Sequence, residues 1–295
     1  MGAVTLEQLP ALLERTGVTL SEAERAVRGL LASVTDSPQF EAAEMLMAAY
    51  GVDKSAILLG GKLPPDAEKR EALLTMVRRR LGREPLQYIL GRWDFFGRPF
   101  YVGEGVLIPR PDTEVLMEQV LLGLQDIRSP RVLELCGGSG CLAVTLSLER
   151  PDAEVWSVEK SEDAYRYLTR NNEALGAGVR TVLGDAFDTD SVEGDFDCIL
   201  CNPPYLSAKD MAELEPELSY EPEMALYGDR DGLYFYRRLT SLWTPRLKKA
   251  GLFAYEIGVG QETAVSRLME EAGLNTICQT RDYSGIMRVV TARKP

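Results

Sequence analysis

Four consecutive residues have the types and order expected of a catalytic turn: Asn202, Pro203, Pro204 and Tyr205, directly after the apolar run 196–201. Proline fixes φ and has no N–H, so such a turn is stiff and its carbonyls have few local donors. Those carbonyls and the Asn202 amide oxygen can accept hydrogen bonds from a planar –NH2 group, while Tyr205 offers the group a flat face. The sequence therefore predicts that these four residues catalyse the alkylation of an amide or an exocyclic amine.

A glycine turn follows the first expected strand, residues 131–135. Glycines at such a point let the backbone approach a ligand and let the next helix begin close to it. A dinucleotide fingerprint would need glycine at position 143, which is Ala143; because alanine is tolerated there, the turn alone does not identify the cofactor. The candidate cofactor-binding residues of this turn are Glu134, Cys136, Gly137, Gly138, Ser139 and Gly140.

Acidic residues also end the next two expected strands. Glu159 follows the glycine turn at about the 20-residue spacing of an acid that accepts from ribose hydroxyls. Asp185 could accept from an adenine amino group, with Ala186 and Phe187 beside the base. This pattern predicts a nucleoside cofactor, which could still be a nicotinamide nucleotide. The turn at Asn202 favours S-adenosyl-L-methionine, because a sulfonium needs no phosphate-binding groups, and it makes Asn202 a candidate cofactor contact as well.

These side chains require an α/β frame. Strand-like and helical runs alternate after residue 111, which predicts a doubly wound, mainly parallel, seven-stranded sheet of Rossmann-like type. The carboxyl edge of such a sheet is where ligands bind. The final two strands are joined by a short turn and predict one antiparallel edge strand. The expected strands are 131–135, 154–159, 182–184, 196–201, 252–257, 276–280 and 287–291.

The chain is expected to have three parts. Residues 1–85 read as helices only, with a capping box from Ser21 to Glu24 and a basic run at 78–80 that we expect to be exposed. Residues 86–110 are rich in aromatics and glycines, which predicts a β-hairpin linker. Residues 111–295 form the expected methyltransferase domain, whose first helix Asp112 could cap.

Composition excludes several classes of site. The chain has no histidine, which removes His-based triads and His zinc sites, and its five cysteines do not suggest a disulfide framework or a metal site. A net charge of −12 argues against non-specific binding to nucleic acid, which needs a basic surface. No run reaches the ~18 apolar residues of a membrane span and no signal peptide is visible, so we expect a cytoplasmic protein without a membrane anchor.

Over essentially its whole length the chain resembles the HemK/PrmC family, the N5-glutamine methyltransferases of peptide chain release factors, within the class I S-adenosylmethionine-dependent enzymes. The Pro-Arg-Pro-Asp-Thr-Glu block is the most specific part of the resemblance. Besides Asn-Pro-Pro-Tyr and the glycine turn, the segments that carry it are 83–91 (Arg-Glu-Pro-Leu-Gln-Tyr-Ile-Leu-Gly), 106–114 (Val-Leu-Ile-Pro-Arg-Pro-Asp-Thr-Glu), Glu221-Pro222, Asp231-Gly232-Leu233 and Glu256-Ile257-Gly258.

The resemblance implies a protein substrate: the glutamine of the Gly-Gly-Gln motif of class I release factors, whose methylation modulates translation termination. It also implies that residues 1–85 recognise that substrate; we expect a monomer. The main alternative is an amine methyltransferase acting on adenine or guanine of ribosomal RNA or DNA. A non-catalytic cofactor-binding protein and a nucleotide-dependent oxidoreductase are further alternatives.

The chain departs from the family pattern at five positions, which are Glu134, Cys136, Ala186, Ile286 and Met287. Cys136 stands where the family has the first glycine of the turn, which predicts an ordinary φ there or a shifted turn. Ala186 stands where a bulky residue is usual, so adenine packing is expected to fall to Phe187. The usual polar residues of the final turn are replaced by Ile286 and Met287.

Overall fold

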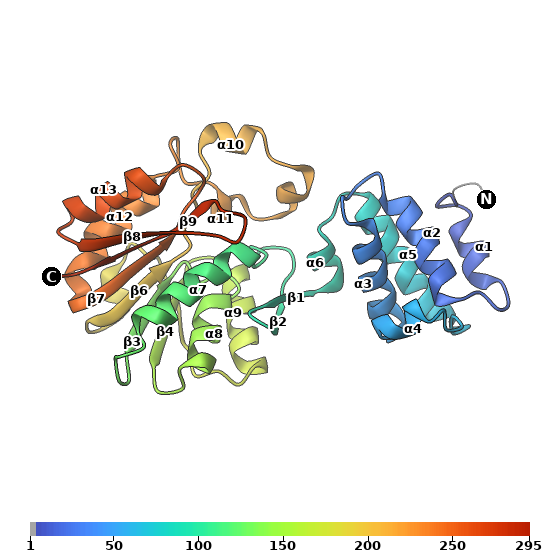
Figure 1. Cartoon of the computed structure of the whole chain (residues 1–295), viewed down its shortest axis with the longest axis horizontal. Coiled ribbons are helices and arrows are strands. Elements are labelled where there is room, and N and C mark those ends of the chain that lie inside the picture. Colours follow the sequence, from blue (N-terminus) through green and yellow to red (C-terminus); the bar gives the residue numbers. More distant parts are fainter. Residues whose placement is uncertain (1–3) are drawn as a thin grey trace. The chain divides into compact units, whose positions relative to one another are not determined.

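The structure, a computed structural model, describes residues 4–295. It has two compact units, one that ends at Gly91 and one of Arg92–Pro295 (Figure 1). The regular elements of the first unit are all helices, whereas every strand of the described chain lies in the second. None of the helices in residues 4–295 combines the length and apolar character needed to cross a membrane.

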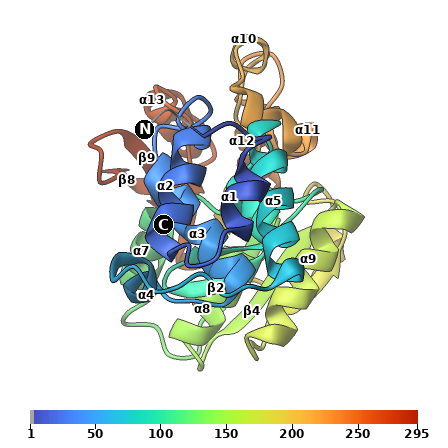
Figure 2. The same cartoon turned by 90° about the vertical axis from the view of Figure 1, so that its right-hand side faces the viewer.

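In the first unit, helices α2, α3 and α5 pack against one another (Figures 1 and 2). The capping box at the start of α2 is Thr19 with Glu22, so the expected box of Ser21 and Glu24 is wrong. The helix already begins at Leu20, so Thr19 is its N-cap, and the Ser21 hydroxyl donates to the Ile57 carbonyl at 2.5 Å instead. The helices of this unit are α1 (Leu9–Glu14), α2 (Leu20–Leu31), α3 (Pro38–Tyr50), α4 (Lys54–Leu58), α5 (Ala67–Leu81) and α6 (Leu86–Leu90).

A buried ion pair joins α3 to α5. Arg80 Nε donates to Glu41 Oε2 at 2.6 Å, and the two side chains are only 5% and 10% exposed. Arg80 Nη2 also donates to the Val34 carbonyl at 2.9 Å. The basic run at the end of α5 is therefore not wholly solvated as expected, because Arg80 turns into the bundle while Arg78 stays outside.

Removing one partner of this pair should destabilise the helical unit strongly. We expect Arg80→Ala to lower the free energy of unfolding by about 3–5 kcal/mol, because the Glu41 carboxylate is left buried without its partner. Arg78→Ala is the matched control; its pair with Glu71 is about half exposed, so its loss should cost less than about 1 kcal/mol. Urea unfolding of the full chain, followed by circular dichroism, measures the free energy of unfolding of both variants. Equal losses would contradict a stabilising role for the buried pair of Arg80 and Glu41.

The second unit is built on a seven-stranded sheet of order β5-β4-β3-β6-β7-β9-β8. Strands β3 to β7 are mutually parallel, and β9 is antiparallel to both of its neighbours. The expected antiparallel edge strand is thus wrong in position: β9 inserts beside β7, and β8 is left at the edge. The strands are β3 (Arg131–Leu135), β4 (Glu154–Glu159), β5 (Arg180–Leu183), β6 (Phe196–Cys201), β7 (Leu247–Glu256), β8 (Asn275–Arg281) and β9 (Met287–Arg293).

Helices cover both faces of this sheet (Figure 1). One apolar cluster joins α7 and α8 to one face, and a second joins α12 and α13 to the other. Neighbouring residues of a strand point to opposite faces, as Val132 and Leu133 do, which confirms the doubly wound class. The helices are α7 (Pro111–Gly123), α8 (Cys141–Glu149), α9 (Glu162–Ala174), α10 (Ala208–Ala212), α11 (Glu223–Leu226), α12 (Tyr234–Trp243) and α13 (Glu262–Glu271), with 3₁₀ turns at Thr189–Ser191, Pro216–Tyr220 and Thr244–Arg246.

A short hairpin of β1 (Arg92–Phe95) and β2 (Arg98–Tyr101) opens the second unit. The expectation of hairpin over all of 86–110 is too broad, because α6 occupies the first residues. The hairpin turn has positive φ at Phe96 (51°) and Gly97 (71°), as a type I′ turn requires. Phe96 is an unusual residue there, and its N–H donates to the Glu114 carboxylate at 2.7 Å.

The Pro-Arg-Pro-Asp-Thr-Glu block forms the start of α7. Arg110 is the N-cap and Pro111 the first helical residue, so Asp112 is in the first turn and does not cap the helix as expected. Proline suits this position because its missing N–H would be unpaired in the helix anyway. Thr113 and Glu114 therefore project from the first turn of α7, and Thr113 is buried.

Candidate active site

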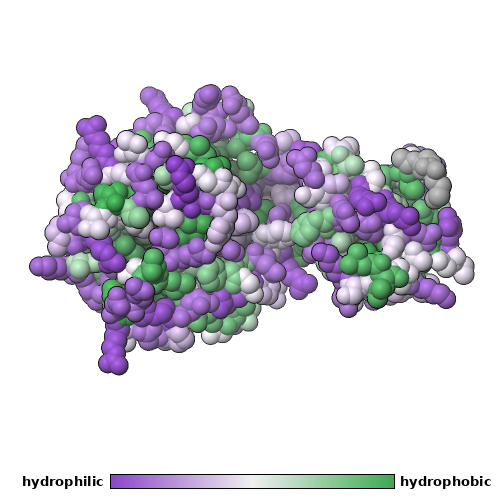
Figure 3. All heavy atoms as spheres, viewed as in Figure 1, coloured by the Kyte–Doolittle hydropathy of each residue, from purple (hydrophilic) through white to green (hydrophobic). Residues whose placement is uncertain are grey.

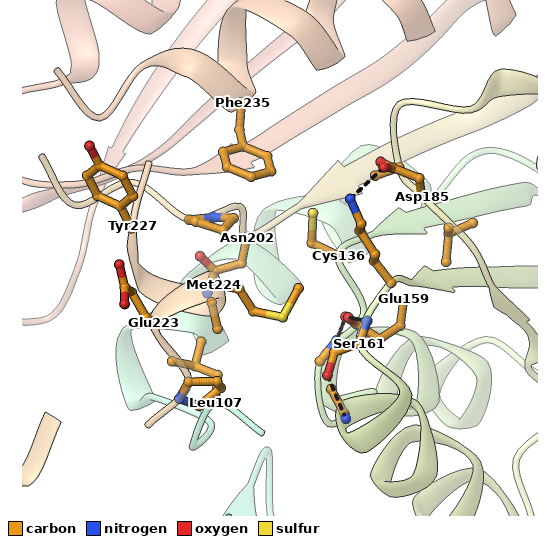
Figure 4. A pocket seen from close by; sticks show the side chains of 18 of the residues that line it. Leu107, Cys136, Glu159, Ser161, Asp185, Asn202, Glu223, Met224, Tyr227 and Phe235 are labelled. Atoms are coloured by element: carbon orange, nitrogen blue, oxygen red, sulfur yellow. Dashed lines mark hydrogen bonds and ion pairs between the residues drawn. The ribbon is translucent and has the colours of Figure 1, made fainter. Parts of the chain in front are cut away.

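A cavity of about 540 Å³ lies at the carboxyl ends of β3, β4, β5 and β6. The strand order reverses between β3 and β6, which is the point where open α/β sheets bind ligands. In Figure 4, Glu159, Ser161 and Asp185 line one side of this cavity, and Glu223, Met224 and Tyr227 the other. Asn202 and Cys136 lie between the two sides, where β6 and β3 end.

The glycine turn after β3 is tight and partly left-handed. Cys136 has φ of 59°, so the expectation of an ordinary φ at this position is wrong. The Gly137 N–H donates to the Val158 carbonyl of β4, and a Cβ atom on Gly137 would lie 2.3 Å from Ser157 Oγ. The turn thus lies so close to β4 that Gly137 has no room for a side chain, and the cysteine before it adopts a left-handed conformation.

The strain at Cys136 can be measured with two substitutions. Cys136→Val should be less stable than Cys136→Gly by more than about 1 kcal/mol, because a β-branched residue resists positive φ. Cys278 of the exposed edge strand β8 is the matched control, since Val is favoured over Gly in a strand and the order there should reverse. Thermal unfolding of the four variants compares their stabilities. If Val is less stable than Gly at position 278 as well as at position 136, backbone strain at Cys136 is not the cause.

Glu159 and Asp185 supply the acceptors of one side of the cavity. Glu159 Oε2 accepts from the Gly138 N–H and Oε1 from the Ser161 N–H, both at 2.7 Å. Asp185 pairs with Lys160 at 2.8 Å. Burial alone would raise the pKa of Asp185, but the hydrogen bonds from Lys160 and the Phe187 N–H lower it below its ordinary value. Both carboxylates are therefore fixed, and each oxygen can still accept a second hydrogen bond.

Glu134 lies in the wall of a second cavity, beside the main one. Its side chain is 1% exposed and accepts from the Ser157 hydroxyl, and burial raises the pKa of Glu134 to about 8. It lines a small neighbouring cavity of about 30 Å³ rather than the main one. Its Oε2 atom lies behind Gly137, 3.3 Å from where a Cβ atom would be, and so supports the glycine turn from that side.

The predicted residues fall into groups by position. Seven of the predicted cofactor contacts line the main cavity: Cys136, Gly138, Glu159, Asp185, Ala186, Phe187 and Asn202. Gly137 and Ser139 line the small neighbouring cavity with Glu134, and Gly140 is the N-cap of α8. Of the predicted catalytic residues, Asn202 and Pro204 line the main cavity, whereas Pro203 is buried and Tyr205 is half-buried.

Asn202 and Tyr205 are both tied to the neighbouring elements. Asn202 Nδ2 donates to Thr113 Oγ1 of α7 at 3.4 Å. Tyr205 Oη donates to Glu256 Oε1 at the end of β7 at 3.5 Å, and burial raises the pKa of Tyr205. The turn after β6 is therefore held from both of its sides.

Sequence reasoning missed the second wall of the cavity. Helix α11 supplies Met224 to it, and the preceding Glu221 accepts from the Ile108 N–H at 2.9 Å and pairs with Arg110. Glu221 is 6% exposed, so the ion pair ties this wall to the loop before α7. The Glu221-Pro222 dipeptide was the available signal, but a dipeptide does not reveal which distant loop it binds.

The cavity fits a nucleoside that carries a positive charge. Its carboxylates can accept from hydroxyl and amino groups, and Phe187 stacks on Phe235 with centroids 5.4 Å apart to give an apolar wall. Among the described residues that line it, Lys160 is the one cation, and it is paired with Asp185. These groups suit S-adenosylmethionine better than a dinucleotide, whose phosphates need donors.

Comparisons with known proteins identify the family. A release factor glutamine methyltransferase of Thermodesulfovibrio yellowstonii is 39% identical over 260 residues, which are 86% of this chain and 92% of that protein. The enzyme of the same name from Geobacter sulfurreducens is 39% identical over 273 residues, or 90% and 93%. The chain belongs to the HemK/PrmC family of release factor glutamine methyltransferases. It is thus an S-adenosylmethionine-dependent methyltransferase, as the resemblance implied.

Two family models agree with this assignment, and a solved structure shares the fold. The PrmC N-terminal domain model matches residues 22–91, and the methyltransferase small domain model matches residues 111–217. The crystal structure of a methyltransferase from Pyrococcus furiosus superimposes with a TM-score of 0.52 over 68% of this chain and 90% of that one. At 19% identity that likeness shows the fold alone, and it confirms the Rossmann-like sheet.

Loss of the Glu159 carboxylate should weaken cofactor binding. We expect Glu159→Ala to raise the Kd for S-adenosylmethionine about 10- to 100-fold, because hydrogen bonds to a charged group are lost and the Gly138 N–H loses its partner. Glu162→Ala removes an exposed carboxylate three residues later and should leave the Kd unchanged. Isothermal titration calorimetry measures both, and an unaltered Kd for Glu159→Ala would remove this residue from the cofactor site.

Proposed function

We propose that this HemK/PrmC enzyme transfers a methyl group from S-adenosyl-L-methionine to the side-chain amide nitrogen of the glutamine in the Gly-Gly-Gln motif of class I peptide chain release factors. Methylation of that motif would modulate translation termination, and we expect the enzyme in the cytoplasm with its substrate. The observation that carries the proposal is the position of Asn202: it stands between the acceptor-lined side of the cavity and the wall of α11, where a substrate amide can meet a cofactor.

The chain's own groups would act by positioning. Asn202 Oδ1 and the Pro203 carbonyl each accept one N–H of the glutamine amide, which fixes its nitrogen and aims the lone pair into the cavity. The bound cofactor supplies an electrophilic methyl group on a sulfonium. Holding two reactants in a productive geometry can contribute roughly 7–11 kcal/mol to the barrier reduction. No general base is needed before transfer, because the nitrogen becomes acidic only once it is alkylated, and the absence of histidine is no obstacle.

The unit that ends at Gly91 is proposed to hold the release factor. It carries exposed apolar side chains at Leu58 and Leu59, which are 72% and 86% exposed, and at Phe40. Figure 3 shows apolar side chains on the surface of this unit near α4. Exposed apolar groups of this kind suit a protein partner better than a nucleic acid, which binds to basic surfaces.

Asn202→Ala provides the direct test of the proposed chemistry. We expect it to slow methylation of an unmodified class I release factor about 10²- to 10³-fold, the usual cost of removing one preorganised group, with little change in the Kd for the cofactor. Mass spectrometry should find one added methyl group, on the glutamine of the Gly-Gly-Gln motif, with the wild-type enzyme.

The same experiment distinguishes the alternative substrate. A release factor whose motif glutamine is replaced by glutamate is the control and should gain no methyl group. Methylation of an RNA or DNA amine, with none on the release factor, would replace our proposal with the nucleic-acid alternative. Near-normal turnover by Asn202→Ala would remove Asn202 from the catalytic role.

A further inference from the structure

Two segments that carry the family resemblance, Asp231-Gly232-Leu233 and Glu256-Ile257-Gly258, lie outside the lining of the main cavity. Both instead meet the end of the Asn-Pro-Pro-Tyr turn. A Cβ atom on Gly232 would lie 2.3 Å from the Tyr205 carbonyl oxygen, and one on Gly258 would lie 3.0 Å from Cδ2 of the Tyr205 ring. Neither position has room for a side chain, so the backbone of both segments packs directly on Tyr205.

The side chain of Gln261, the residue before α13, joins these two segments to the turn. Its Nε2 atom donates to the Tyr205 carbonyl at 2.9 Å and to the Gly232 carbonyl at 3.4 Å. Its Oε1 atom accepts from the Gly258 N–H at 2.9 Å. The amide of one side chain thus connects the turn after β6 with the segment before α12 and the segment after β7.

The Gln261 amide has a single satisfactory orientation. A backbone N–H can only donate and a backbone carbonyl can only accept, so Oε1 must face Gly258 and Nε2 must face Tyr205. Glutamate has nearly the same shape, but when ionised it can only accept, and methionine of similar length offers no donor. These contacts therefore require the amide of glutamine and not merely a side chain of its size.

The Asn-Pro-Pro-Tyr turn is stiff between its two ends, so its attachments decide where its functional groups lie. It begins at Asn202, directly after β6, and Pro203 and Pro204 have a fixed φ. Beyond the turn, Leu206 pairs with the segment that follows α11, which is itself part of an irregular wall. Gln261 ties this end of the turn to the segment after β7, and thus to the sheet.

We propose that Gln261 is a positioning residue for methyl transfer, which holds the carboxyl end of the Asn-Pro-Pro-Tyr turn where its acceptors and the Tyr205 ring meet the substrate amide. The inference rests on the proposed function, since that function gives the turn its substrate. Gln261 lies outside the lining of the main cavity and is assigned no contact with substrate or cofactor. The carboxylates of the cofactor side, Glu159 and Asp185, are held by other groups, so the effect of Gln261 falls on catalysis and not on cofactor binding.

Gln261→Glu tests the donor while it keeps the shape of the side chain. We expect kcat for release factor methylation to fall about 100-fold, because a displacement of about 1 Å in a reacting geometry can cost that much. The Kd for S-adenosylmethionine, measured by isothermal titration calorimetry, should keep its wild-type value. A parallel loss of cofactor binding would overturn the proposal, since Gln261 would then support the whole unit and not the turn.

Gln261→Met separates the lost hydrogen bonds from the charge that Gln261→Glu introduces. It removes the same donor without adding a carboxylate, so kcat should fall by a comparable factor while the cofactor still binds. This variant also provides the test if Gln261→Glu does not fold. A wild-type kcat in Gln261→Met would overturn the proposal, because the hydrogen bond to the Tyr205 carbonyl would then have no effect on methyl transfer.

Gln279→Glu is the matched control for the change of charge. Gln279 is exposed on β8, and its Nε2 atom also bonds to α13, through Ser266 Oγ at 2.9 Å. The substitution therefore removes a donor to the same helix and adds the same carboxylate, but it does not touch the Asn-Pro-Pro-Tyr turn. It should leave kcat unchanged, and an equal fall at positions 261 and 279 would refute the role of Gln261.

A measurement that needs no turnover follows the Tyr205 carbonyl directly. Labelling with ¹³C-carbonyl tyrosine and ¹⁵N-leucine gives a coupled signal for each tyrosine that precedes a leucine, and the chain has two such dipeptides, Tyr167-Leu168 and Tyr205-Leu206. Tyr205→Phe removes the second signal and so assigns it. Its carbonyl frequency should shift in Gln261→Met, which removes the hydrogen bond, and stay in place in Gln279→Glu. The signal of Tyr167-Leu168, within α9, is the internal reference.

This measurement also separates the inference from the proposed function. If the wild-type enzyme fails to methylate the release factor but the Tyr205 carbonyl signal shifts in Gln261→Met, the proposed substrate is wrong and the hold of Gln261 on the turn stands. If methylation occurs and the Tyr205 signal is the same with and without Gln261, the proposed function stands and the present inference is refuted.

Discussion

The reversal of strand order between β3 and β6 is the constraint on which the site depends. Parallel strands on either side of this point send their following loops in opposite directions, so a gap opens between the two loops. The register pairs Leu135 with Cys201, and the next residue of each strand is therefore Cys136 or Asn202. The glycine turn and the Asn-Pro-Pro-Tyr turn, for which we propose cofactor and substrate binding, thus begin side by side because of strand pairing, before any side chain contributes.

The loops around the site need polar anchors, since they lack the hydrogen bonds of a sheet ladder. Buried Asn171 of α9 provides one: it bonds both backbone groups of Tyr101 in β2, and its Nδ2 also donates to the Ser139 carbonyl at 2.8 Å. Glu114 holds the hairpin turn and Glu221 holds the loop before α7. Each anchor joins segments far apart in sequence, so the walls of the cavity are fixed relative to the sheet.

Local signals allowed much of the fold to be predicted. Strands β3, β4 and β6 have the expected bounds, because each is a short apolar run that ends at an unambiguous turn residue. Strand β7 begins at Leu247, five residues before the expected strand 252–257. The place of β9 depends on pairing between distant strands, which a strand–turn–strand pattern leaves open. The residues of the Asn-Pro-Pro-Tyr turn could be picked out, but the hydrogen bond of Tyr205 to Glu256 could not, since it exists only once β7 lies beside β6.

Two buried carboxyl groups, Glu134 on β3 and Glu256 on β7, lie on the strands beside β6, and both lower the stability of the fold at neutral pH. Burial raises the pKa of Glu134 to about 8 and that of Glu256 to about 7, well above the ordinary value near 4.5. Between pH 4.5 and these values the folded chain holds protons that the unfolded chain has lost, so both groups reduce stability as pH rises through that range. Apolar residues of similar volume would avoid this loss. Both acids lie beside the strand that carries Asn202, and the hydrogen bonds that they accept there, from Ser157 and from Tyr205, are therefore held at the expense of stability.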